Sequence, residues 1–305
     1  MSAMPSSLPA LAGPFAPGNE GAYRRWRAAK LVNRPRSIEE LVVPVADAGA
    51  LSPAERSALL RAIARAGFAI YRSGVGAEDG TLPRRLGAQL GLRRLDANWL
   101  AGEDGVSRIA VSGGCDDHAG FIPYTDRAIG WHTDGYYHPQ QRRIRGMVLH
   151  CVRPAREGGE NRLLDPELAY IAVRDRSALL AQALMQPDAM TIPERTDESG
   201  VGRAAQSGPV FSVDEDGCLH MRYTARTRSI AWKDDAATRQ AAALLQDVLA
   251  TSPDVWRIRT EAGMGLVGQN VLHDRSAFID DPRQPRLVLR ARFLDRPAEG
   301  PCRNG

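Results

Sequence analysis

Lysine, closely spaced cysteines and long apolar runs are scarce or missing in this chain of 305 residues. Lys30 and Lys233 are the only lysines, so nearly all of the 40 basic residues are arginines, and they are scattered among 36 acidic residues. A nucleic-acid-binding protein more often gathers its basic residues in one stripe. We therefore expect no nucleic-acid partner and attribute the arginine excess to genome composition.

The cysteines and the apolar segments exclude further classes of protein. The four cysteines form no Cys-x-x-Cys pair, which argues against a zinc ribbon or a disulfide framework and fits a reducing cytoplasm. No run of 18 apolar residues is present, so no membrane span is expected. Residues 1–20, rich in Pro, Ser, Gly and Ala, predict a flexible N-terminal tail, and residues 21–305 predict a single domain.

Capping residues and apolar periodicity predict helices at several places along the chain. Ser52 and Glu55 form a capping box ahead of an apolar stripe, and Gly67 is expected to end that helix. Asp165 precedes a proline and is expected to cap a second helix. Residues 236–250 have the apolar periodicity of a third helix.

Strand-forming segments occupy much of the remaining chain. They are residues 68–73, 129–134, 144–152, 208–227 with a turn at 214–217, 255–272 and 286–294. Many strands with a few peripheral helices predict a mainly β fold with flanking helices, of jelly-roll type.

The stretch "IGWHTDGYY" places His132 and Asp134 one residue apart in a predicted strand. Alternate side chains of a strand point to opposite faces, so these two polar groups would share one face. A histidine hydrogen-bonded to its neighbour at a strand end would explain the pair equally well. A third ligand changes that balance. His273, in "GQNVLHDRSAF", completes the two-histidine, one-carboxylate triad that is typical of non-haem Fe(II) oxygenases.

A row of arginines follows His273. In "RLVLRARFL", Arg286, Arg290 and Arg292 fall on one strand face, and the other face is apolar. A buried guanidinium requires an anion, and its planar fork clamps a carboxylate through two hydrogen bonds. A solvated strand face with surface arginines is the alternative. The proximity to a candidate iron ligand favours a carboxylate co-substrate.

Four motifs together resemble one family. "WHTDGYY", "GGEN", "NVLHDRSAF" and "RLVLRARF" are similar, in order and spacing, to the taurine dioxygenase-like group of Fe(II)/2-oxoglutarate-dependent oxygenases, from about residue 120 to 295. The resemblance implies a double-stranded β-helix (jelly-roll, cupin-like) core, bound iron, and 2-oxoglutarate and O2 as co-substrates. It implies that His132, Asp134 and His273 bind iron. It also implies that Arg286 binds the distal carboxylate of 2-oxoglutarate, supported by Asn161 where family members often carry threonine.

The activity that this resemblance implies is hydroxylation of a small polar or anionic metabolite, with release of succinate and CO2. Desaturation or ring closure with the same cofactors is an alternative outcome. Asp134 argues against halogenation, because its carboxylate occupies the position that chloride would need. A different class of alternative is a non-catalytic jelly-roll protein that binds a metabolite or a metal. The sequence does not fix the oligomeric state, and a homo-oligomer is compatible with it.

Signals on the substrate side are weaker. Tyr136 directly follows the predicted metal strand, and Arg222, Tyr223 and Arg226 follow a predicted hairpin strand. Arg290 falls where some family members hold the anionic group of the primary substrate. These residues are candidates for an anionic substrate, and an arginine-rich surface loop is the alternative for residues 221–228.

The other histidines have simpler interpretations. His150 lies in a predicted core strand, where a packed and hydrogen-bonded imidazole is expected. His118, His138 and His220 have no spacing that assigns them to the iron site.

Overall fold

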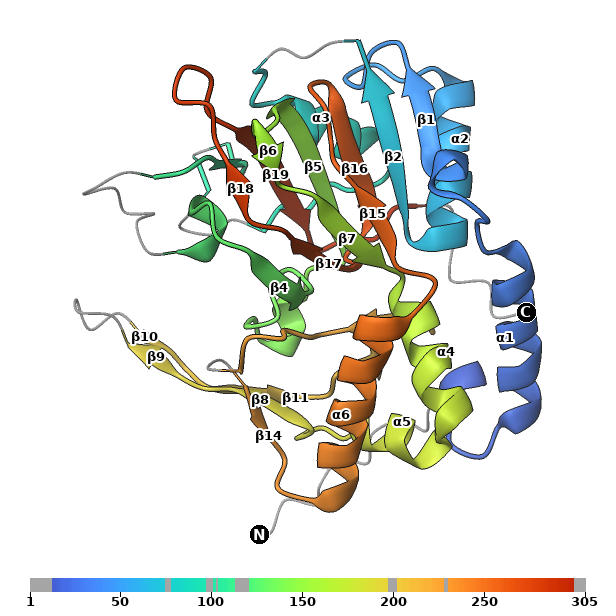
Figure 1. Ribbon diagram of the computed structural model, residues 1–305. Coiled ribbons are helices and arrows are strands. Elements are labelled where there is room, and N and C mark those ends of the chain that lie inside the picture. Colours follow the sequence, from blue (N-terminus) through green and yellow to red (C-terminus); the bar gives the residue numbers. More distant parts are fainter. Residues whose placement is uncertain are drawn as a thin grey trace, which may run out of the picture.

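The computed structural model describes residues 13–74, 78–96, 101–102, 104–112, 121–196, 202–227 and 230–298. Two β-sheets form its centre, and helices cover the outside (Figure 1). Side chains from both sheets line one cavity, which therefore lies between them. This arrangement confirms the predicted mainly β fold with flanking helices.

The larger sheet has six strands in the order β1-β2-β16-β5-β19-β3. β1 and β2 are parallel, whereas the other neighbours pair antiparallel. The strand bounds are β1 Val42–Val45, β2 Phe68–Ser73, β3 Ser107–Ile109, β5 Gly146–Arg153, β16 Met264–Gln269 and β19 Leu287–Phe293. The apolar face of β19 packs in the main core, as the alternation in sequence predicted.

The smaller central sheet has four strands in the order β15-β7-β17-β4, all antiparallel. Their bounds are β4 Ile129–His132, β7 Asn161–Leu164, β15 Trp256–Ile258 and β17 Leu272–Arg275. β17 and β4 are far apart in sequence, yet the register places His273 directly opposite His132. The strand predicted over residues 129–134 ends at His132, so Asp134 lies in the turn that follows it.

Helix α2 (Pro53–Ala66) packs its apolar stripe on the large sheet, in a core shared with β2 and β16. The predicted capping box between Ser52 and Glu55 is present. Gly67 ends the helix in the left-handed region with φ 79°, as expected of a C-terminal glycine. Helix α3 (Leu82–Gln89) packs against β5 and β19.

A second apolar cluster forms around α4 (Pro166–Arg176), α5 (Ala178–Leu184) and α6 (Ala236–Thr251), which contact one another. Helix α1 (Glu20–Asn33) lies beside α4 (Figure 1), and Asp165 caps α4 as predicted. Short strands complete the described part of the fold. They are β6 Glu157–Gly158, β8 Met190–Ile192, β9 Arg195–Thr196, β10 Gly202–Arg203, β11 Gln206–Gly208, β12 Phe211–Val213, β13 Leu219–Met221, β14 Ala231–Trp232 and β18 Phe278–Ile279.

The N-terminal segment differs from its prediction. Residues 1–12 lie outside the described residues, but Gly13–Phe15 forms a 3₁₀ helix, and Phe15 is buried against Trp26 and Tyr170. The predicted tail over residues 1–20 is therefore wrong from residue 13 onward. The proline and glycine content of this segment suggested a flexible chain, although its one aromatic residue, Phe15, packs in the core.

Two expectations from the sequence, the absence of disulfides and the absence of a membrane span, can be compared with the structure. Cys151 is a buried free thiol, whereas Cys218 is disulfide-bonded. The bond departs from the expected absence of disulfides, because spacing in sequence does not show which cysteines meet in space. No described helix has the length and apolar character needed to cross a bilayer.

Candidate active site

Two imidazoles meet where β4 and β17 pair. The ring centroids of His132 and His273 are 4.2 Å apart. The Nδ1 atom of His132 lies 2.9 Å from the carbonyl oxygen of Gly130, and Nδ1 of His273 lies 2.9 Å from that of Val271. A carbonyl only accepts, so each Nδ1 carries the proton and donates it. In the neutral tautomer that this donation selects, each Nε2 keeps a lone pair for a metal ion.

Asp134 completes the cluster from the turn after β4. Ligand atoms of His132, Asp134 and His273 all lie within 4.8 Å of one another. The side chain of Asn270 fixes the backbone of Asp134, because its Oδ1 accepts from the Asp134 N–H at 2.8 Å and its Nδ2 donates to the Asp134 carbonyl at 2.8 Å. Oδ2 of Asp134 is buried and has no hydrogen-bond partner among the described residues. An unpaired buried carboxylate oxygen beside two imidazole lone pairs fits a divalent cation.

The charge states in this cluster suit metal binding. Burial, followed by the proximity of His273, lowers the pKa of His132 to about 3, so the imidazole is neutral near pH 7. Burial alone would raise the pKa of Asp134, but Arg290 and Arg292 outweigh it and hold that pKa below its usual value. The cluster thus presents a neutral imidazole at His132 and an ionised carboxylate at Asp134, the protonation states that metal ligands require.

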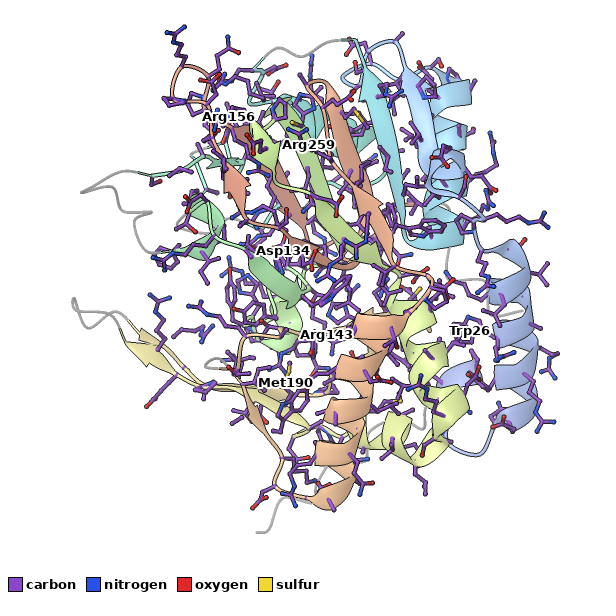
Figure 2. The ribbon with its side chains drawn as sticks, viewed as in Figure 1. Trp26, Asp134, Arg143, Arg156, Met190 and Arg259 are labelled. Atoms are coloured by element: carbon purple, nitrogen blue, oxygen red, sulfur yellow. The ribbon has the colours of Figure 1, made fainter. Side chains whose placement is uncertain are left out.

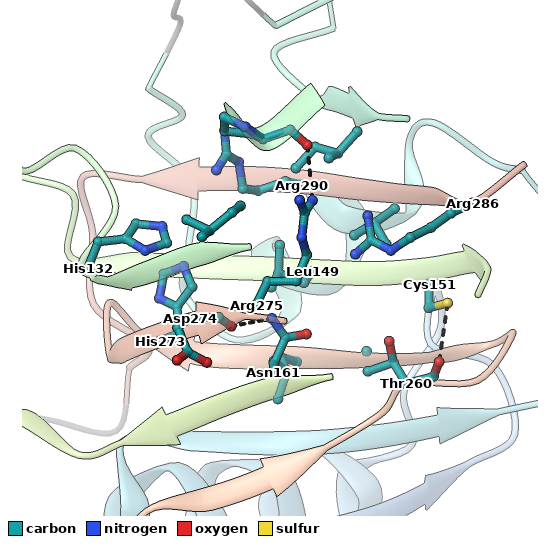
Figure 3. A pocket seen from close by; sticks show the side chains of 16 residues that line it. His132, Leu149, Cys151, Asn161, Thr260, His273, Asp274, Arg275, Arg286 and Arg290 are labelled. Carbon is teal, nitrogen blue, oxygen red and sulfur yellow. Dashed lines mark hydrogen bonds between the residues drawn. The ribbon is translucent and has the colours of Figure 1, made fainter. Parts of the chain in front are cut away.

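A cavity extends from the two histidines between the sheets. Figure 3 shows the imidazoles toward one end and Arg286 toward the other, with Asn161 between them on the opposite wall. Nη1 of Arg286 is buried without a hydrogen-bond partner among the described residues. Burial lowers the pKa of Arg286, which shows that the site disfavours an uncompensated charge. Asn161 uses its Nδ2 to donate to the Asp274 carbonyl at 2.7 Å.

Arg290 and Arg292, on the same strand as the cavity wall, connect Asp134 to a second buried carboxylate. Nη1 of Arg290 donates to Oδ1 of Asp134 at 3.0 Å. Arg292 donates to Asp96 at 2.6 Å and to the Tyr137 hydroxyl at 3.0 Å. The predicted arginine row is therefore buried, not solvated, and two of its members are already paired with acids.

The predicted substrate residues are separated by the structure. Tyr136 and Arg222 line a second cavity beside Asp134. Tyr223 is fully buried in the helix-side core, and Arg226 is exposed. The alternative of an arginine-rich surface loop thus describes Arg226 but not Arg222.

The remaining histidines also have defined places. His150 is buried, and its Nδ1 lies 2.9 Å from the Tyr71 hydroxyl, which confirms a packed and hydrogen-bonded imidazole. His138 lies 3.2 Å from Asp96, and His220 lines the second cavity. His118 lies outside the described residues.

Three further groups at the site were not predicted from the sequence: Asn270, Asp96 and Arg143. Asn270 lies three residues before His273, so its position in "GQNVLH" was an available signal. Asp96 is remote in sequence from its arginine partner, and no local pattern marks it. Arg143 lines the second cavity, but in sequence it is one arginine among many.

Comparison with known proteins decides the family. The chain matches the family described as "Taurine catabolism dioxygenase TauD, TfdA family" over residues 31–292. The chain belongs to this family.

Relatives of this TauD/TfdA family protein include a "Uridine-5'-phosphate dioxygenase" of Amycolatopsis sp, 32% identical over 188 residues. That match covers 60% of this chain and 66% of the relative, so it spans just under two thirds of the relative's length. The fold is shared with a taurine dioxygenase from Burkholderia xenovorans, with TM-score 0.58, 18% identity, and coverage of 88% of this chain and 96% of that one. The non-heme iron oxygenase OrfP, solved with Fe and alpha-ketoglutaric acid, also has TM-score 0.58, at 18% identity over 81% of each chain.

Proposed function

We propose that this TauD/TfdA family protein is an Fe(II)- and 2-oxoglutarate-dependent dioxygenase that hydroxylates a small anionic metabolite. One observation carries the proposal. A single cavity joins two imidazole lone pairs at one end to an unpaired, buried guanidinium at the other. A short dicarboxylate fits such a cavity, because one end can reach a metal while the other forms charge-assisted hydrogen bonds with Arg286.

His132, Asp134 and His273 would hold Fe(II), and Arg286 with Asn161 would hold 2-oxoglutarate. When bound, the iron and 2-oxoglutarate supply the activation of O2, with release of succinate and CO2 and oxidation of a substrate C–H bond. The contribution of the chain is to place and shield these groups. With only three protein ligands, a bound Fe(II) would have further positions for the co-substrate and O2.

The residues around the cavity have separate tasks. Arg290 keeps Asp134 ionised and oriented through its 3.0 Å hydrogen bond. Leu149, Leu266 and Val288 line the cavity walls and limit the access of water to the co-substrate. An apolar lining lowers the local dielectric constant, which strengthens the electrostatic attraction between Arg286 and a carboxylate.

The substrate class is inferred from chemistry and from the relative. Both cavities at the site are lined by arginines, which favours an anion. The Amycolatopsis relative is named for uridine-5'-phosphate. A nucleoside 5'-monophosphate is therefore the first substrate to test.

The deciding experiment measures succinate formed from 2-oxoglutarate with Fe(II), O2 and a panel of nucleotides, amino acids and sulfonates. We expect stimulation of succinate release by an anionic member of the panel, and a weak visible absorption band when 2-oxoglutarate is added anaerobically to the Fe(II)-loaded protein. If adding iron and 2-oxoglutarate changes neither the absorption spectrum nor the release of succinate, the protein is a non-catalytic binding protein instead. Mass analysis of the product separates hydroxylation from desaturation or ring closure.

A further inference from the structure

A second cavity lies beside Asp134 and is lined by polar groups that the proposed iron and 2-oxoglutarate sites do not use. Arg143, Arg222 and His220 line it, together with the hydroxyl-bearing Ser207 and Ser212. Figure 2 labels Arg143 between Asp134 and Met190. The cavity shares Asp134 with the candidate metal site, so a ligand held here lies next to the metal ligands.

Arg143 carries a positive charge without a local partner. Its side chain has no hydrogen bond or ion pair among the described residues. Burial, and then the charge of Arg145, lower its pKa. The carboxylate that opposes this effect, Asp214, is already paired with Arg296 at 3.0 Å. Arg143 is therefore available to an incoming anion.

Arg222 adds a second charge that no acid neutralises. It donates to the carbonyl oxygens of Tyr136 at 2.8 Å and Gln206 at 2.7 Å, and it forms no ion pair among the described residues. Burial, and then Arg143 and Arg203, lower its pKa to about 10. Carbonyl groups hold its guanidinium in place but leave its charge unpaired.

His220 is nine-tenths buried between these arginines, and its imidazole has no hydrogen-bond partner among the described residues. Burial, and then Arg296 and Arg143, hold its pKa well below the usual value, so it is neutral. Asp134 is the acidic residue that lines the cavity; its Oδ1 accepts from Arg290, and its unpaired Oδ2 belongs to the candidate metal site. The cavity thus has two unneutralised positive charges and a neutral donor.

We propose that this cavity binds the phosphate of a phosphomonoester substrate, with Arg143 and Arg222 supplying the charge and His220 and Ser212 supplying hydrogen bonds. The proposal rests on the proposed function and specifies its substrate class. A phosphate monoester carries nearly two negative charges and three terminal oxygens, which matches two arginines and several further donors. A carboxylate, with one charge and two oxygens, would leave part of this donor set unused. The substrate anion would then bind in the second cavity, and not at Arg290, which lines the first.

The test titrates the protein, loaded anaerobically with Fe(II) and 2-oxoglutarate, with uridine-5'-phosphate, uridine and inorganic phosphate by calorimetry. Arg143→Gln is the test variant. Arg145→Gln is the matched control, because Arg145 lies two residues away and lines neither cavity. We expect Arg143→Gln to weaken uridine-5'-phosphate binding by roughly ten- to a hundredfold, the loss expected for a charge-assisted hydrogen-bonding partner. Uridine affinity and the 2-oxoglutarate absorption band should be unchanged, and Arg145→Gln should stay within about threefold of the wild type.

Three results would overturn the proposal. They are equal affinity of the wild type and Arg143→Gln for the nucleotide, an equal loss of affinity for uridine, and no binding of either the nucleotide or inorganic phosphate to the wild type. The 2-oxoglutarate band is an independent readout of the proposed function. Its presence without phosphate binding would reject this site alone, whereas its absence would reject the dioxygenase.

Discussion

At the scale of single residues, two backbone carbonyls determine what the site can bind. The carbonyls of Gly130 and Val271 each fix the proton on Nδ1 of a histidine two residues further along. This hydrogen bond leaves the Nε2 atoms as the metal-binding nitrogens, and ligand atoms of both histidines and Asp134 lie within 4.8 Å of one another. The two imidazoles are consequently oriented by the backbone of their own strands.

Replacing a ligand should remove the metal. We expect His132→Ala, Asp134→Ala and His273→Ala each to abolish turnover and to weaken Fe(II) binding sharply, because each removes one of three donors. Anaerobic iron titration of the three variants measures the effect. His150→Ala, which removes a buried histidine outside the cluster, is the control and should keep its iron affinity. Unchanged iron affinity in all three ligand variants would reject the metal centre.

Arg286 and Arg290 should differ in their effects. Loss of the carboxylate clamp at Arg286 removes a few kcal/mol of binding, so we expect Arg286→Ala to raise the 2-oxoglutarate requirement roughly a hundredfold with iron binding intact. Arg290 donates to Asp134, so Arg290→Ala should weaken iron binding first. Kinetics at varied 2-oxoglutarate, with iron titration, separate the two. A large 2-oxoglutarate defect in Arg290→Ala alone would reverse the assignment.

At the scale of elements, local signals predicted helices and strand faces, whereas the ends of strands depended on tertiary contacts. The capping residues Ser52 and Asp165 were recognisable because caps are local in sequence. The end of β4 at His132 was not, because Thr133 donates its N–H to the carbonyl of Tyr223, a residue remote in sequence. The contact of Asn270 with Asp134 was hidden for the same reason.

The junction of α2 and β2 offers a test at this scale. Gly67 has φ 79°, and a Cβ there would lie 2.9 Å from Cγ1 of Val271. We expect Gly67→Ala to destabilise the protein by about 1–3 kcal/mol, through backbone strain and this contact. Urea unfolding measures the difference. Gly74→Ala is the control, since a Cβ at Gly74 has no atom within 4 Å and its φ is not positive. Equal stability of the two variants would contradict the strain argument.

At the scale of the whole molecule, a buried ion cluster ties the N-terminal helix to the helical layer. Lys30 of α1 contacts Asp165 and Glu167 at the start of α4, each at 2.6 Å. Burial disfavours the charge of Lys30, but the two carboxylates outweigh it and raise the pKa of this lysine. The cluster therefore persists across the neutral range.

Removing this lysine should be far more harmful than removing the other one. Lys30→Met leaves the buried Asp165 and the partly exposed Glu167 without a counter-charge, so we expect a loss of about 3–5 kcal/mol in unfolding free energy. Lys233, paired with Asp188 at the surface, is the matched control, and Lys233→Met should change stability by less than about 1 kcal/mol. Thermal and urea unfolding of both variants decide it. Adding Asp165→Asn and Glu167→Gln to Lys30→Met should recover part of the loss.

The sequence predicted the family, the fold class and the three candidate iron ligands, because the motifs that carry them are short and local. It did not predict that Arg222 and Arg226 would separate, nor that Arg143 would join Arg222 at one cavity, because these placements depend on strand pairing across long separations. The single domain over residues 21–305, the cytoplasmic location and a homo-oligomer stay predictions.

The position of β19 in the large sheet has a consequence for biosynthesis. This strand is the last described along the chain, yet it lies between β5 and β3 and carries the cavity-lining Arg290. During translation, the edge of β5 that pairs with β19 therefore stays unpaired while more than a hundred later residues are synthesised. Unpaired strand edges in nascent chains are prone to aggregation. We expect ribosome-bound chains that stop before Leu287 to depend on chaperones and to lack the 2-oxoglutarate pocket until the final strand emerges.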